Sequence, residues 1–147
     1  MPIRPREFDE VAQHFAPLLR GLPPKLVAVD GRAGSGKSTL GRFLAWYFNS
    51  TLIELDLYLV EGGLVHRVEE IKHLIDRRLG LRRPVFVEGL LVLQILETIE
   101  RKPSHLIYVR NRKWPRGLGF GPELDAYDAR YRSAENADYL MELEHDG

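Results

Sequence analysis

Cysteine is absent from the sequence, and so is any hydrophobic run long enough to cross a membrane. Without cysteine the chain can form neither disulfide bonds nor thiolate metal sites. A membrane-spanning helix needs roughly 20 consecutive apolar residues, and the apolar runs here are far shorter. The first residues, MPIRPREFDE, are charged and lack the apolar segment of a secretory signal. We therefore expect a cytoplasmic protein with no membrane partner.

Neither sign of charge is in excess, because 21 basic residues balance 21 acidic residues. This balance argues against a surface built as a whole for nucleic acid. The 5 histidines show no spacing typical of metal ligands. With 147 residues, of which 44% are hydrophobic, the chain has the length and composition of one globular domain covering residues 1–147.

Hydrophobic residues alternate between helical and strand-like spacing along the chain. Helical spacing predicts helices at 8–18, 40–47, 64–79, 90–99 and 124–131. Apolar runs predict strands at 26–30, 51–55, 84–89, 105–110 and 138–144. The run LVAVD, at 26–30, has the pattern of a strand buried on both faces of a parallel sheet. The alternation therefore predicts an α/β fold with a parallel sheet and helices on both faces.

The segment between the first strand and the second helix is rich in glycine. Residues 31–38 read GRAGSGKS and fit the phosphate-binding pattern G-x-x-x-x-G-K-[ST] at every fixed position. Glycines let the backbone N–H groups approach and surround an anion, and the following helix adds the positive end of its dipole. We expect nucleotide binding through Gly31, Gly34, Ser35, Gly36, Lys37, Ser38 and Thr39.

A triphosphate site also needs a magnesium ion and residues that hold it. Ser38 can offer its hydroxyl to Mg²⁺. Glu88 ends the apolar strand PVFVEG, where a carboxylate is costly unless a cation compensates it, and we expect it to act as the second metal-holding residue. Asp30, which ends the first strand, is the other candidate, although it also suits a structural role as an acceptor for N–H groups of the loop.

The stretches VAVDGRAGSGKSTL, ELDLYL, VFVEGLL and ADYLM, together with an arginine-rich loop, resemble uridine kinase and related small P-loop kinases. The resemblance covers about residues 26–143. It implies a three-layer P-loop NTPase fold with a five-stranded parallel sheet in the order 2-3-1-4-5. It also implies transfer of the γ-phosphoryl group of ATP, with Mg²⁺, to the hydroxyl of a small-molecule acceptor.

The same resemblance suggests catalytic residues besides Lys37. An acidic residue after the second strand accepts the proton of the attacked hydroxyl in these kinases. Asp56 matches best here, with Glu54 as the alternative. An arginine-bearing lid closes over the phosphates, and the segment at about 111–122 corresponds to it. Arg112 is the arginine we select, while the other candidates are Arg110, Lys113, Arg116, Arg130 and Arg132.

One departure from these kinases concerns the acceptor site. The relatives carry a substantial insertion between the helix that corresponds to 64–79 and the third strand, and this chain does not. A pocket for the acceptor would have to be formed by Asp56, Tyr58, Glu61, His66 and Arg67. A nucleoside, a smaller hydroxylated metabolite, and nucleotide binding without kinase activity therefore all stay open. A GTPase is disfavoured because the guanine-reading pattern N-K-x-D is missing, and a motor usually needs more chain.

Overall fold

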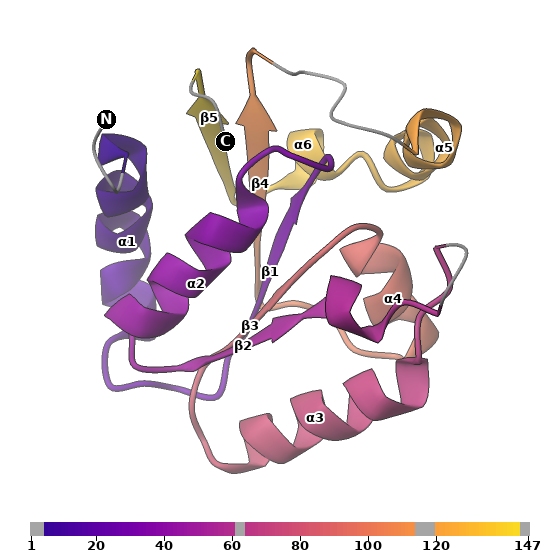
Figure 1. Cartoon of the computed structure of the whole chain (residues 1–147). Helices are drawn as coiled ribbons and strands as arrows, with labels where there is room; N and C mark the ends of the chain where they lie inside the picture. The colour runs from indigo at the N-terminus through magenta and orange to yellow at the C-terminus, as the bar shows by residue number, and fades with distance from the viewer. Residues whose placement is uncertain (1–4, 61–63, 114–119, 145–147) are drawn as a thin grey trace.

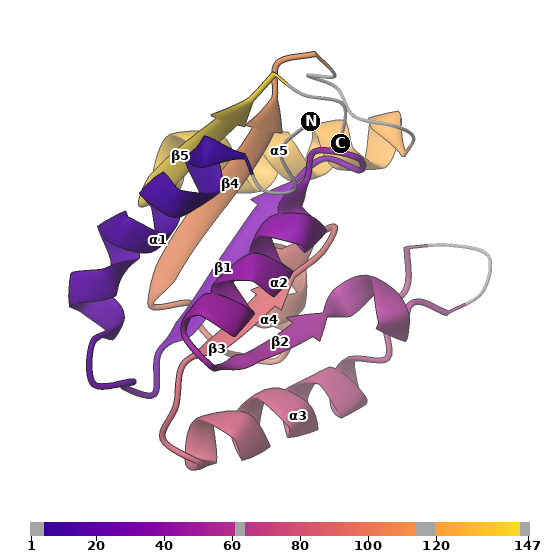
Figure 2. The same ribbon diagram turned by 60° about the vertical axis from the view of Figure 1, so that its left-hand side comes forward.

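The computed structural model describes residues 5–60, 64–113 and 120–144 (Figure 1). Its centre is a parallel sheet of 5 strands in the order β2-β3-β1-β4-β5, seen one after another in Figure 2. The strands are β1 (Leu26–Gly31), β2 (Thr51–Glu54), β3 (Val85–Glu88), β4 (His105–Asn111) and β5 (Tyr139–Leu143). The predicted fold class and strand order are confirmed.

Helices cover both faces of this sheet. They are α1 (Arg6–Leu19), α2 (Lys37–Tyr47), α3 (Val68–Gly80), α4 (Val92–Thr98), α5 (Gly121–Tyr131) and α6 (Ser133–Asn136). Val27 and Val29 of β1 pack in one core cluster with α1 and α2, while Leu26 and Ala28 pack in another with α3 and α4. Both faces of β1 are therefore buried, which explains its unbroken apolar sequence. No helix among the described residues combines the length and apolarity needed to span a bilayer.

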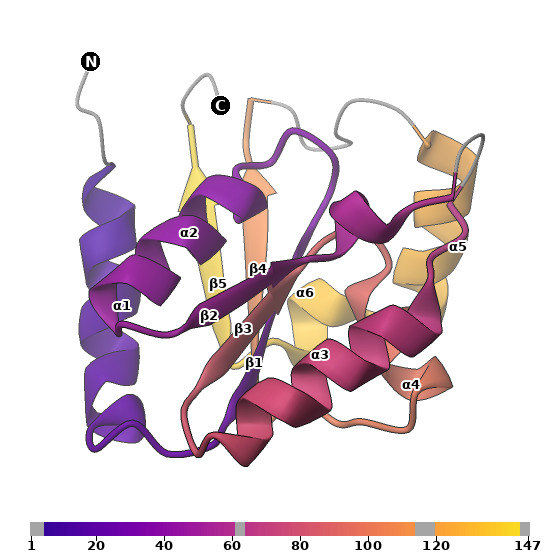
Figure 3. The same cartoon turned by 60° about the horizontal axis from the view of Figure 1, so that its bottom comes forward.

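The register of the strands brings the ends of β1, β2 and β3 to one edge of the sheet. Val29 of β1 is opposite Glu88 of β3, which in turn is opposite Glu54 of β2. The loop between β1 and α2 and the segment between β2 and α3 consequently lie at the same edge (Figure 3). Ligands of open α/β sheets bind at this edge, beyond the carboxyl ends of the strands.

The segment after β2 differs from the prediction of a longer strand and an earlier helix. Residues 55–58 form a 3-10 helix, η1 (Leu55–Tyr58), and α3 begins at Val68 rather than at residue 64. Between them the chain doubles back, because Leu59 bridges His66 in antiparallel pairing. The backbone N–H of Arg67 donates to the carbonyl of Tyr58 over 2.8 Å. These backbone hydrogen bonds join residues far apart in the sequence, and they replace the helical hydrogen bonds that the apolar spacing predicts.

Other helices also begin at residues that differ from the predicted ones. Gly89 and Leu91 both have positive φ, 153° and 61°, so a turn separates β3 from α4, which starts at residue 92 rather than 90. Helix α5 starts at residue 121, inside the segment predicted as a lid. Within that lid, residues 114–119 lie outside the described part of the chain. Helix α6 was not predicted, since its 4 residues are too few to show a period.

Candidate nucleotide and catalytic site

The glycine-rich loop runs from the end of β1 into the first turn of α2. Gly34 and Gly36 have φ of 78° and 104°, a region that favours glycine. At Gly31, an added Cβ would lie 2.7 Å from both the Ser35 hydroxyl and the Val109 carbonyl. Backbone conformation and close packing thus require glycine at these positions. The motif occupies the strand–loop–helix setting in which it binds phosphate.

Lys37 begins α2 and is only 5% exposed. Its Nζ atom lies 3.4 Å from the carbonyl oxygen of Arg32, which also accepts the backbone N–H of Ser35 over 3.1 Å. Ser35 is buried as well, and its Oγ atom has no hydrogen-bond partner. The cation of Lys37 is therefore enclosed by the loop, where it is less hydrated than a surface lysine.

Glu88 lies beside this lysine, at the end of β3, and is 1% exposed. Burial raises the pKa of its carboxyl group, while the charge of Lys37 and the Ser38 hydroxyl act in the opposite direction. The Oε2 atom is buried without a partner. A carboxylate oxygen without a partner, next to a hydroxyl at the head of α2, fits a magnesium ion. No cluster of three or more His, Asp or Glu side chains suited to a metal occurs in the described residues, so phosphate and water would complete the coordination.

Asp56 lies in η1 at the same edge of the sheet. Its Oδ1 atom accepts the backbone N–H of Leu90 over 3.3 Å, and its charge raises the pKa of Glu88. The backbone passes close by at Gly89, where an added Cβ would lie 2.7 Å from the Leu55 Cβ. The side chain of Asp56 is exposed. The predicted base therefore stands near the predicted metal residue and is open to an acceptor.

Glu54, the alternative base, has a different environment. The guanidinium of Arg42, on α2, contacts its Oε1 atom at 2.6 Å and 2.9 Å. This ion pair joins the end of β2 to the helix that follows the glycine loop. The geometry favours Asp56 over Glu54 as the group that is open to a substrate.

Three of the residues predicted to form an acceptor pocket cluster near Asp56, and Glu61 lies outside the described part of the chain. The Arg67 guanidinium stands 5.8 Å from the centre of the Tyr58 ring and donates to the Leu57 carbonyl over 3.1 Å. His66 is buried with its Nε2 atom unpartnered, and burial lowers its pKa although the charge of Asp56 acts in the opposite direction. This environment favours a neutral histidine.

Arg112 follows β4 and is held by β5. Its guanidinium donates to Glu142 over 2.5 Å and to Glu144 over 2.8 Å, which raises its pKa. Two other candidates, Arg130 of α5 and Arg132 directly after that helix, also contact glutamates. Each of these arginines would have to exchange a carboxylate for a phosphate to act on the nucleotide.

A set of contacts between α5 and the start of the glycine loop is not evident from the sequence. The Tyr127 hydroxyl donates to Asp30 Oδ2 over 2.8 Å, and the Arg32 guanidinium contacts both Asp125 and Asp128. Asp30 also accepts the N–H of Gly31 over 2.8 Å, as its structural role predicts. Desolvation by burial raises the pKa of Asp30 to about 6. The spacing of Asp125 and Asp128 on a helix was the only signal of this contact in the sequence.

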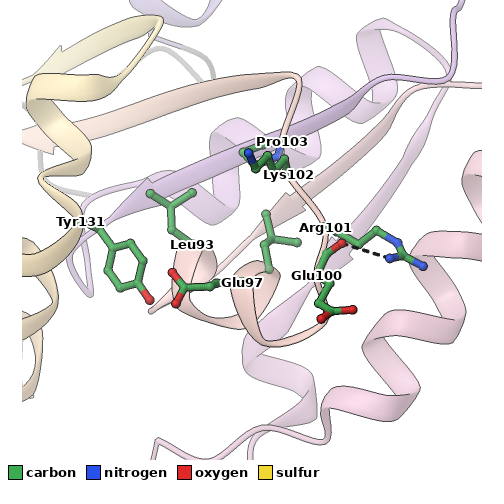
Figure 4. A pocket seen from close by; sticks show the side chains of 8 residues that line it. Leu93, Glu97, Glu100, Arg101, Lys102, Pro103 and Tyr131 are labelled. Atoms are coloured by element: carbon green, nitrogen blue, oxygen red, sulfur yellow. Dashed lines mark hydrogen bonds between the residues drawn. The ribbon is translucent and has the colours of Figure 1, made fainter.

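A mainly apolar cavity of about 450 Å³ lies elsewhere, between α4, the segment before β4 and the end of α5 (Figure 4). Leu93, Glu97 and Tyr131 line it, with the Tyr131 ring directed toward Glu97. None of the predicted site residues contributes to its walls. The cavity is therefore separate from the candidate catalytic site.

No protein-family model and no curated protein sequence matches this chain. Among solved structures, a possible uridine kinase from Bacillus stearothermophilus is similar over 92% of this chain and 97% of its own, with a TM-score of 0.66 and 14% identity. A sugar kinase from Janibacter sp. is similar over 84% of this chain and 87% of its own, with a TM-score of 0.53 and 11% identity. The chain therefore has the fold of P-loop kinases, as the resemblance of its motifs implies.

Proposed function

We propose that the protein transfers the γ-phosphoryl group of ATP to the hydroxyl of a small-molecule acceptor. The observation that carries this proposal is the arrangement of Lys37, Ser38 and Glu88 around the glycine loop. A buried lysine and a buried carboxylate with an unpartnered oxygen form a site for a triphosphate and its metal. A cytoplasmic location, which the sequence predicts, would supply both ATP and Mg²⁺.

In this proposal the loop residues 31–39 bind the phosphates through backbone N–H groups, and Lys37 contacts the outer phosphates. Ser38 and Glu88 would hold Mg²⁺, which would neutralise charge on the phosphate oxygens. Phosphoryl transfer depends mainly on positioning and electrostatic stabilisation. The enclosed cation of Lys37 is therefore the largest contribution of this chain's own residues.

Asp56 acts as the base that receives the proton of the acceptor hydroxyl. Its exposed carboxylate and its position beside Glu88 support this role. We propose that Arg112 neutralises negative charge in the transition state, because its planar guanidinium can bind two phosphate oxygens at once. To act, it would exchange Glu142 and Glu144 for phosphate oxygens.

A second candidate is a nucleotide-binding module without kinase activity. It is supported by the short connection between α3 and β3, which leaves no insertion for an acceptor domain. It is also supported by the buried apolar cluster of Leu90, Leu91, Leu124 and Tyr127. Asp56 accepts the backbone N–H of Leu90, so these buried side chains limit the room for an acceptor beside it.

Release of ADP from Mg·ATP, measured across nucleosides, sugars, vitamins and polyol phosphates, tests the proposal. We expect one acceptor class to stimulate release in the wild type and none to do so in Lys37→Ala. ATP binding without any acceptor-dependent release would favour the binding module. Failure of Mg·ATP to bind at all, seen as an unchanged melting temperature, would overturn both candidates.

A further inference from the structure

Helix α5 contacts the start of the glycine loop through two polar connections. In the first, the Tyr127 hydroxyl donates to Asp30 Oδ2, and the other oxygen of Asp30 accepts the Gly31 N–H, each over 2.8 Å. In the second, Arg32 donates to Asp128 through Nε over 3.0 Å and through a terminal nitrogen over 2.6 Å. The same terminal nitrogen also contacts Asp125.

Burial makes these contacts costly to lose. Asp30 is 2% exposed and Tyr127 is 4% exposed. The Tyr127 oxygen accepts the backbone N–H of Leu93 over 3.0 Å, so its own proton is left to point toward Asp30. A buried acceptor that loses its donor is costly to leave unpaired. Removing the Tyr127 hydroxyl should therefore disturb Asp30 and, through it, the backbone N–H of Gly31.

The second connection reaches the lysine of the loop. The carbonyl oxygen of Arg32 accepts the N–H of Ser35 and lies 3.4 Å from the Lys37 Nζ atom. The side chain of the same residue is fixed by Asp128 and is only 11% exposed. Anchoring the Arg32 side chain thus fixes the carbonyl that closes the turn and contacts the cation.

We propose that Tyr127 and Asp128 of α5, acting through Asp30 and Arg32, are positioning residues that hold the phosphate-binding loop in its binding conformation. This inference rests on the proposed nucleotide binding. None of the four needs to touch the nucleotide. They set the backbone of residues 31–35, so that its N–H groups are arranged before the triphosphate arrives.

Tyr127→Phe removes one hydroxyl and keeps the ring. Tyr131→Phe is the matched control, because Tyr131 lies one turn later on the same helix and its hydroxyl is beside Glu97. We expect the Kd for Mg·ATP to rise about fivefold to tenfold in Tyr127→Phe, the scale of one ordinary hydrogen bond, and to stay unchanged in Tyr131→Phe. Equal affinities in both variants would overturn the proposal.

A pH profile separates positioning from general stability. Asp30 faces Tyr127 and Asp128 of α5, Ser133 of α6, Tyr108 of β4 and its own loop. Because the Tyr127 hydroxyl lowers the pKa of Asp30, its removal should move the inflection in Kd to higher pH. Titration of the nucleotide itself is the same in both proteins and cancels in the comparison. A lower melting temperature with an unmoved inflection would indicate a structural role only.

Amide exchange in the nucleotide-free protein tests the positioning without relying on nucleotide binding. We expect faster exchange at Gly31 and Ser35 in Tyr127→Phe, and also in Asp128→Asn, which serves if the first variant fails to fold. The control Tyr131→Phe should exchange like the wild type. Unchanged exchange in both variants would overturn the inference, whereas a wild type that does not bind Mg·ATP would overturn the proposed function instead.

Discussion

Two glutamates end neighbouring strands at the same level of the sheet and differ in every other respect. Glu54 of β2 and Glu88 of β3 are directly opposite in the parallel register. Glu54 is partly exposed and its carboxylate is bound by Arg42. Glu88 is buried beside Lys37 and keeps one oxygen without a partner. The carboxylate of Glu54 is thus paired by the protein, whereas one oxygen of Glu88 is left without a hydrogen-bond partner.

The Glu54 carboxylate takes part in an ion pair of the fold, whereas the Glu88 carboxylate has an oxygen available to a ligand. A buried carboxylate with a free oxygen is destabilising, as the raised pKa of Glu88 indicates. Such a cost is typical of functional sites, where a ligand supplies the missing partner. The pair Arg42–Glu54 needs no ligand. Variants around Glu88 should therefore change nucleotide binding, whereas variants of the Arg42–Glu54 pair should not.

The largest effect is expected for Lys37→Ala, compared with Arg42→Ala on the same helix. Loss of Lys37 removes the cation beside Glu88 that we propose contacts the phosphates, so Mg·ATP affinity should fall by about 100-fold. Loss of Arg42 removes only the partner of Glu54 and should leave affinity unchanged. Calorimetric titration of both variants measures the contrast. Similar losses in the two proteins would contradict it.

Asp56→Asn extends the comparison to the acceptor side. The change keeps the shape of the side chain and removes the proposed base, so we expect acceptor-dependent turnover to fall by about 100-fold while Mg·ATP affinity is nearly constant. Steady-state kinetics with the acceptor found by ADP release provides the measurement. Turnover at the wild-type rate would remove Asp56 from the mechanism, and Glu54→Gln would then be the variant to examine.

Asp30 provides a test of buried charge that depends on pH. Its pKa is raised from 3.8 to about 6, so the folded state holds the proton more tightly than the unfolded state. The stability linked to this proton is complete below about pH 4 and is lost as the pH rises through about 6. Relative to Asp30→Asn, the wild type should lose about 3 kcal/mol of unfolding free energy across this range, at 1.36 kcal/mol per pKa unit. Denaturant titrations below about pH 4 and above about pH 6 provide the measurement. If the prediction were wrong, the difference in unfolding free energy between the wild type and Asp30→Asn would be the same at both pH values.

A smaller loss of turnover than for Asp56→Asn is expected for Arg112→Gln. Its ion pairs with Glu142 and Glu144 are exposed, and such pairs contribute little to stability, so the melting temperature should hardly change. If Arg112 neutralises charge in the transition state, turnover should fall by about tenfold, less than for a unique donor because neighbouring cations can substitute. Turnover equal to that of Arg130→Gln would assign no special role to Arg112.

The sequence was most informative where backbone conformation dictates residue type. The positive φ of Gly34 and Gly36 leaves little choice of residue, so the phosphate-binding loop could be recognised from its spacing. Glu88 could be selected because a charge at the end of an apolar strand needs an explanation. The strand order came from resemblance to P-loop kinases rather than from periodicity.

The rest depends on contacts between distant parts of the chain. Tyr127 and Asp30 are 97 residues apart, and helical spacing alone identifies Tyr127 only as a core residue of α5. The bridge between Leu59 and His66 likewise overrides the helical pattern of the apolar residues around it. Ion pairing of Arg112 with β5 could not be read from a basic, glycine-rich segment.

The dependence of nucleotide binding on Mg²⁺ in Glu88→Gln and Glu54→Gln tests the central claim most directly. Both variants keep the shape of the side chain and remove one negative charge from neighbouring strand ends. We expect Glu88→Gln to need at least about tenfold more Mg²⁺ for half-maximal ATP binding, the scale of a lost charged ligand, and Glu54→Gln to match the wild type. Identical Mg²⁺ dependence in all three proteins would contradict the assignment of Glu88 to the metal.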